Sequence, residues 1–159
     1  MSKEQDLGRT NAQQMNIRAA RTIADTVKST LGPMGMDKML VDGHGNVIVT
    51  NDGATILREV DVSNPGGKMI AEVAKTQENL CYDGTTSTVV LAGALLGNTE
   101  SLFARGLHPN VICRGYHEAS LMATTYLNDE VAMLAEGREE YLKIARTAIT
   151  GKTLENALD

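Results

Sequence analysis

The chain has 159 residues, of which 42% are hydrophobic and 22% charged, and this is enough for one domain with a hydrophobic core. Its formal net charge is −5 and its basic residues form no run, which argues against nucleic-acid binding. The longest strongly apolar stretch, 89–96, is too short to cross a bilayer, and the polar start lacks a secretory signal, so we expect a cytoplasmic protein with no membrane partner.

The first predicted element is a helix over residues 11–31. Its apolar residues recur at spacings of three and four, at Ile17, Ala20, Ala24, Val27 and Leu31. Gly32-Pro33 is expected to end it, because proline cannot continue a helix and glycine favours its end. Two short apolar runs follow, 38–42 and 46–50, around the turn Gly43-His44-Gly45. This pattern predicts a β-hairpin, the one clear β signal in the chain.

The rest of the chain is predicted to be helical, so the fold class is mainly α with one hairpin. The expected helices cover 54–60, 65–80, 83–105, 109–134 and a last segment after Gly137. Pro65 suits a first helical turn. The helix that contains 89–96 is apolar on all sides, which predicts a central, buried position. Cys81 and Cys113 have no metal-ligand spacing, and we expect two reduced, largely buried thiols.

Three glycine-bearing turns lie beside predicted helix ends, at 31–35, 51–55 and 83–87. The third is the most informative. Asp83 is a good helix N-cap, Gly84 lets a phosphate approach the backbone, and the next three residues carry hydroxyls. Because the first amides of a helix lack internal partners, this segment can cradle an anion, and Asp83 can hold Mg²⁺.

Each turn also has an ordinary explanation: a helix stop, a plain turn and a capped helix. Their spacing alone does not decide between these explanations and a nucleotide site. The tripeptide 151–153 (GKT) resembles the end of a P-loop. That motif needs glycine five residues before Gly151, where this chain has Arg146 in a helical pattern, and no strand precedes it. A Walker-type site is therefore rejected.

Five segments carry a family resemblance: TLGPMGMDKMLVD (30–42), VTNDGATIL (49–57), KMIAEVAKTQE (68–78), DGTTSTVVLAGALL (83–96) and TAITGK (147–152). In order and spacing the chain resembles the start of group II chaperonins, the archaeal thermosome and its eukaryotic cytosolic relative, with the thermosome the nearer of the two. The resemblance implies an ATP-dependent chaperone subunit in a double ring with other chaperonin subunits. It also implies a multihelical equatorial ATP-binding domain over 1–141 and the start of an intermediate domain over 142–159. The hairpin would contact a neighbouring subunit.

The resemblance further implies the site residues, with ATP and Mg²⁺ as cofactors. Asp83 would be the metal ligand, and Asp52 the catalytic residue that orients the attacking water. The nucleotide would be bound by Leu31, Gly32, Pro33, Gly53, Gly84, Thr85, Thr86, Ser87, Gly151 and Lys152. Phosphoryl transfer fits such a set, because it needs charge neutralisation and a positioned water more than covalent chemistry.

Two residues depart from the family pattern. Tyr82 stands where the family has glycine, and it would be strained by about 1 kcal/mol or more if the backbone there needs a positive φ. Met34 stands where many relatives carry a basic residue.

Length is a third departure. The apical domain, which binds unfolded proteins in the family, the second intermediate segment with another catalytic Asp, and the C-terminal equatorial half are not in these 159 residues. We therefore expect an unmatched apolar face on 89–96 and no ATPase activity from the isolated chain. The alternatives are a nucleotide-binding or ring-interacting module without turnover, or a purely structural fragment.

Overall fold

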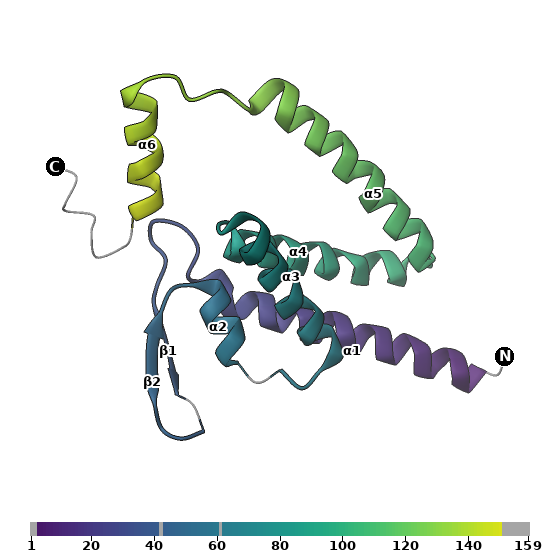
Figure 1. Ribbon diagram of the computed structural model, residues 1–159. Helices are drawn as coiled ribbons and strands as arrows, with labels where there is room; N and C mark the ends of the chain where they lie inside the picture. Colours follow the sequence, from purple (N-terminus) through teal and green to yellow (C-terminus); the bar gives the residue numbers. More distant parts are fainter. Residues whose placement is uncertain (1–2, 42, 61, 151–159) are drawn as a thin grey trace. The chain divides into compact units, whose positions relative to one another are not determined.

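The computed structural model describes residues 3–41, 43–60 and 62–150 (Figure 1). The chain forms two compact units, Met1–Ser101 and Leu102–Asp159. The mainly α fold class with one hairpin is confirmed. Gly151 and Lys152 lie outside the described residues. The domain boundary at 141–142 stays a prediction.

Helix α1 (Lys3–Lys28) begins earlier than predicted and ends sooner. The predicted apolar stripe is buried as far as Val27, but Leu31 is exposed and does not belong to it. The reason lies at Thr30, whose backbone N–H and side-chain hydroxyl both donate to the Val27 carbonyl, at 3.0 and 2.7 Å. This turn ends the helix before Leu31 can join the buried face.

The hairpin of β1 (Lys38–Val41) and β2 (Val47–Thr50) is confirmed as an antiparallel pair. Because side chains alternate across a strand, one face carries Leu40, which packs against the core of the first unit. The opposite face is apolar and exposed, and it consists of Met39, Val41, Val47 and Val49. Register pairs Met39 with Val49 and Val41 with Val47, so these four side chains form one continuous surface, called the outer hairpin face below.

Helices α2 (Gly53–Glu59) and α3 (Pro65–Cys81) follow the hairpin and pack against α1 around Val27, Ile56 and Ile70. Pro65 occupies the first turn of α3, as predicted, and Asn64 caps it by accepting the Gly66 N–H at 2.8 Å. A side-chain cap thus fixes where each helix starts, Asp52 for α2 and Asn64 for α3.

Helix α4 (Thr85–Ala104) packs on α1 through Gly93, where a Cβ would collide with the Cβ of Ala24. Val89 is fully buried, but Leu91 is 60% exposed. The prediction of a helix buried on all sides is therefore wrong for the described residues, because only part of its circumference packs against other helices of its unit. Within 89–96, Leu91 and Leu95 are the exposed large apolar side chains, and the cause expected for an unmatched face stays a prediction.

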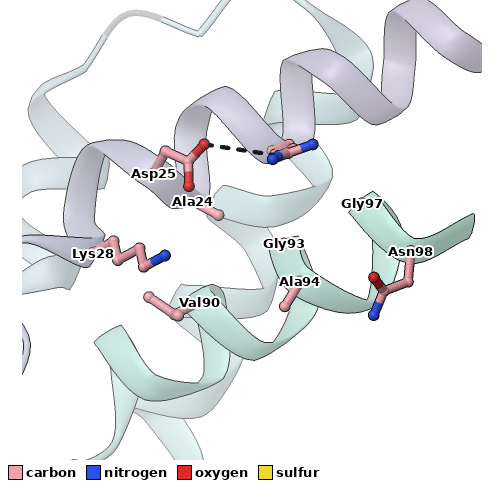
Figure 2. Close-up of a pocket in the computed structure, with 9 residues that line it drawn as sticks. Ala24, Asp25, Lys28, Val90, Gly93, Ala94, Gly97 and Asn98 are labelled. Carbon is pink, nitrogen blue, oxygen red and sulfur yellow. Dashed lines mark ion pairs between the residues drawn. The ribbon is translucent and has the colours of Figure 1, made fainter. Parts of the chain in front are cut away.

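A pocket of about 250 Å³ lies between α1 and α4 (Figure 2). Its wall includes Arg21, Asp25 and Lys28 from α1 and Gly93, Gly97 and Asn98 from α4. Arg21 and Asp25 form an ion pair at 3.9 Å across one turn of α1, dashed in Figure 2. None of the residues predicted to bind nucleotide lines this pocket.

The second unit contains α5 (Pro109–Tyr126), the π-helical turn η1 (Leu127–Val131) and α6 (Arg138–Ile149). The predicted helix over 109–134 is α-helical only to Tyr126 and then widens into the π-turn, whose last N–H, at Ala132, donates to Leu127. No described helix combines the length and apolar character that crossing a bilayer requires.

Both cysteines are free thiols, but the expectation that they are buried is wrong. Cys81 is the last residue of α3, beside the exposed Tyr82, and is itself exposed. Cys113 is exposed on α5, a helix that buries Ile112 next to it. Burial of these side chains depends on position in the helix rather than on residue type.

Candidate functional site

Asp52 is the N-cap of α2 and is held in place by Thr55. Its Oδ2 accepts hydrogen bonds from the Thr55 N–H at 2.8 Å and the Thr55 hydroxyl at 2.7 Å. Its own N–H donates to the Thr50 hydroxyl at 3.1 Å. Partial burial raises the pKa of Asp52, but hydrogen bonds from Thr55 and Ala54 and the charge of Arg58 outweigh it, so the pKa is lowered. The carboxylate is ionised at neutral pH.

The turn from α3 to α4 contains the departure at Tyr82. This residue has φ 56° and ψ 11°, and it is the one non-glycine with positive φ in the part of the chain that the structure describes. Its N–H donates to the Glu78 carbonyl at 3.0 Å, which closes the end of α3. Tyr82 is 85% exposed and forms part of the wall of a pocket of about 520 Å³ between α2 and α3. Tyr82 therefore occupies a left-handed position, which meets the condition on which the expected strain depends.

Gly84, not Asp83, occupies the capping position of α4. The Gly84 carbonyl accepts the first helical hydrogen bond, from Thr88, at 2.9 Å, and its φ is +72°. Asp83 lies one residue earlier, and its Oδ1 accepts the Gly84 N–H at 2.7 Å. The prediction of Asp83 as N-cap is wrong because the left-handed glycine turns the chain into the helix one residue later. The carboxylate stays exposed beside the first turn of α4.

The N-termini of α2 and α4 lie against each other. A Cβ at Gly53 would be 2.5 Å from the Thr86 hydroxyl oxygen and 3.3 Å from the Thr86 Cα. Two of the three predicted turns are thereby brought together. Thr85 is buried, Thr86 is half-buried and Ser87 is exposed, so the exposure of these hydroxyl-bearing residues increases along the turn.

The third predicted turn, after α1, is exposed. Gly32 has φ +86°, and no atom lies within 4 Å of the position that its Cβ would take. Leu31 and Pro33 are exposed beside it. The turn is closed by the Gly35 N–H, which donates to the Gly32 carbonyl at 2.9 Å. The described contacts of Gly32 do not tie this turn to the other two.

Sequence reasoning gave no role to two residues of α3 that hold this region together. The Gln77 side-chain amide donates to the main-chain carbonyl of Asp83 at 2.9 Å. Glu78 forms an ion pair with Arg58 of α2, with both carboxylate oxygens 3.4 Å from Nη2. Their position in the sequence could have identified them, because both residues lie in the last turns of α3, directly before the glycine-bearing turn.

Residues 23–159 match the TCP-1/cpn60 chaperonin family. The chain belongs to this family. It is 58% identical over 151 residues to the thermosome subunit alpha of Archaeoglobus fulgidus and 55% identical over 150 residues to the thermosome subunit of Methanopyrus kandleri. Each alignment covers 94% of this chain but 28% of the relative. The resemblance to group II chaperonins is thus confirmed, and this chaperonin-family chain spans about 28% of the length of these curated relatives.

Proposed function

We propose that the chain is part of an ATP-dependent chaperone subunit, and that the N-termini of α2 and α4 bind MgATP. The observation that carries this proposal is the contact between Gly53 and Thr86. It brings the start of α2, which is capped by Asp52, against the first turn of α4, which follows Asp83 and Gly84. Membership of a chaperonin family whose relatives include thermosome subunits supports it.

The phosphates would lie at the start of α4. The first amides of this 20-residue helix have no partner within the helix, and its dipole favours a negative charge there. Gly84, Thr85, Thr86 and Ser87 would supply N–H and hydroxyl donors. Gly53 lets the two helix ends approach. Leu31, Gly32 and Pro33 would contact the rest of the nucleotide, and Gly151 and Lys152 would reach the terminal phosphate.

Asp83 fits the requirements of a Mg²⁺ ligand. Its side chain is exposed, Oδ1 accepts one backbone N–H, and Oδ2 has no protein donor among the described residues. No group of three or more His, Cys, Asp or Glu in the described chain could form a protein-only metal site. Nucleotide-bound Mg²⁺ needs only one or two carboxylates, because phosphates and water supply its other oxygens. When bound, it supplies neutralisation of charge on the phosphate oxygens.

Asp52 would orient the water that attacks the terminal phosphate. Its carboxylate is ionised and cannot swing freely, since Thr55 holds Oδ2 with two hydrogen bonds. A fixed carboxylate can accept a hydrogen bond from a water molecule and hold that water in line with the phosphorus–oxygen bond that breaks. Because the helix terminus that carries Asp52 contacts the terminus that carries Thr86, the water and the phosphates would share one site.

A second function, a ring-interacting module, is favoured by the outer hairpin face. This face exposes four apolar side chains, between 57% and 70% each, on a sheet of two strands. Surfaces of this kind mark protein contacts, and other chaperonin subunits are the proposed partners. We also propose binding of unfolded proteins and a location in the cytoplasm, both as properties of a full-length subunit. This chain spans only 28% of the length of the thermosome subunit alpha that it resembles.

Calorimetric titration of the full 159-residue chain with MgATP tests the nucleotide site, with Asp83→Ala as the matched variant. We expect saturable binding by the wild type and loss of the Mg²⁺-dependent part in Asp83→Ala. A folded wild-type chain that binds no MgATP would contradict the proposal. Turnover is measured in parallel, and we expect none from the isolated chain. A clear rate that Asp52→Ala abolishes while it still binds MgATP would contradict that expectation and separate hydrolysis from binding.

A further inference from the structure

We propose that Gln77 is a positioning residue: its side-chain amide fixes the peptide between Asp83 and Gly84, and thereby the carboxylate and first amides that the proposed nucleotide site uses. This inference rests on the proposed function for its consequence, but not for its geometry. Gln77 contributes no atom to the phosphates or the metal. It acts through the turn.

The geometry consists of two hydrogen bonds on one rigid unit. Gln77 Nε2 donates to the Asp83 carbonyl oxygen at 2.9 Å. At the other end of the same peptide, the Gly84 N–H donates to Asp83 Oδ1 at 2.7 Å. Because a peptide group is planar, fixing its oxygen also fixes the direction of its N–H. Gln77 therefore sets the direction from which Gly84 bonds to the Asp83 carboxylate.

This turn needs an external anchor because its backbone is unusual. Tyr82 at φ 56° and Gly84 at φ +72° flank Asp83, so two left-handed residues surround it. The tyrosine conformation is unfavourable, and strained conformations persist only where surrounding contacts determine them. Rotation of the Asp83–Gly84 peptide would turn its carbonyl away and break the bond from Gln77, which lies six residues earlier in the last turns of α3.

The chemistry of glutamine suits this position. It donates without carrying charge, so it does not compete with a metal for Asp83 or with the helix amides for an anion. A glutamate there would face the Asp83 carbonyl with an acceptor and add a negative charge beside the phosphates. The adjacent Glu78 pairs with Arg58 on α2. Neighbouring residues of α3 thus contact the turn that leads into α4, through Gln77, and the last turn of α2, through Glu78.

The test compares Gln77→Leu, which removes the donor at similar size, with Gln77→Glu, which keeps the shape and replaces the amide. Gln14→Leu on α1 is the matched control. The Gly84 amide signal and its hydrogen exchange are followed by ¹H–¹⁵N NMR in the nucleotide-free full chain, and nucleotide affinity is measured with and without Mg²⁺. In both Gln77 variants we expect a changed chemical shift and faster hydrogen exchange for the Gly84 amide. We also expect the affinity for MgATP to fall about tenfold. In Gln77→Leu, affinity without Mg²⁺ should change less than affinity for MgATP, and Gln14→Leu should change neither.

An unmoved Gly84 amide in both Gln77 variants overturns the inference, whether or not the chain binds nucleotide. A moved amide with unchanged MgATP affinity in a binding wild-type chain overturns it too. If the wild type binds no MgATP, the proposed function fails, and a moved Gly84 amide still supports the positioning of the turn. Should Gln77→Leu not fold, Gln77→Met, which also removes the donor without adding charge, gives the same comparison.

Discussion

Gly53 lies so close to Thr86 that a Cβ on the glycine would be 2.5 Å from the threonine hydroxyl oxygen. The two residues belong to different motifs and to different helices, and each stands at or next to the first residue of its helix. The absence of a side chain at position 53 is therefore what allows the two N-termini to meet. Without this contact, Asp52 and the first turn of α4 would belong to separate surfaces.

Replacement of this glycine should separate the two helix ends. We expect Gly53→Ala to lower the free energy of unfolding by about 1–3 kcal/mol, the usual cost of overpacking. Urea denaturation measures the effect. Gly115→Ala on α5 is the control, because no atom lies within 4 Å of its Cβ position and alanine favours helix. Equal stability of Gly53→Ala and wild type would show that the contact relaxes without cost.

The left-handed Tyr82 predicts an effect of the opposite sign. We expect Tyr82→Gly to raise the free energy of unfolding by about 1 kcal/mol, because glycine adopts positive φ without steric cost. Thermal or urea unfolding measures it. Tyr126→Gly makes the same replacement in a right-handed residue, with φ −59°, and should lower stability. A loss of stability in Tyr82→Gly would mean that contacts of the exposed ring outweigh the backbone strain.

The lowered pKa of Asp52 predicts that its cap depends on pH. The folded-state pKa lies below its usual 3.8, so the stabilisation is present above that value and is lost as pH falls through the lowered pKa. We expect Asp52→Ala to cost about 1 kcal/mol at pH 7, with the difference from wild type shrinking below pH 3.8. Urea unfolding across pH 7 to about 2.5 measures it.

Asn64→Ala is the control for this pH dependence, because Asn64 caps α3 with an uncharged side chain. Its cost should stay constant over the same pH range. A pH-independent difference for Asp52→Ala would show that the carboxyl group caps α2 equally well when protonated.

Local patterns predicted most of the elements. Spacings of three and four located α1 through Ile17 to Val27, and the turn at 43–45 located the hairpin. Exposure could not be predicted in the same way: Leu91 and Cys81 are apolar or neutral residues in helices, and their burial depends on which neighbours pack beside them. The end of α1 was misplaced because two hydrogen bonds from Thr30 to the Val27 carbonyl close its last turn.

The candidate site divides similarly. Asp52, Asp83 and the hydroxyls after Gly84 were predicted because their residue types suit phosphate and metal chemistry and because the motifs resemble a family, and their roles stay predictions. Gln77 was missed because its partner is a main-chain carbonyl, which has no identity in a sequence. The sequence predicts strain at Tyr82 only if the backbone there has a positive φ, and the structure supplies that angle, 56°.

The outer hairpin face gives the last prediction. Met39 and Val49 are paired across the strands and are 70% and 63% exposed, so charging them removes little packing within the unit. A two-stranded sheet leaves backbone edges available to a further strand, and an apolar face beside those edges strengthens such pairing. We expect Met39→Lys/Val49→Lys to keep the thermal midpoint within a few degrees and to weaken self-association or association with other chaperonin subunits.

Sedimentation velocity over a range of concentrations measures this, with Met133→Lys as the control because Met133 is 92% exposed in the second unit. If subunits pair through the hairpin, the double variant sediments as a smaller species while Met133→Lys behaves as wild type. If both variants associate as wild type does, the outer hairpin face is not the contact. An equal loss in both would point to general apolar association, which any added charge reduces.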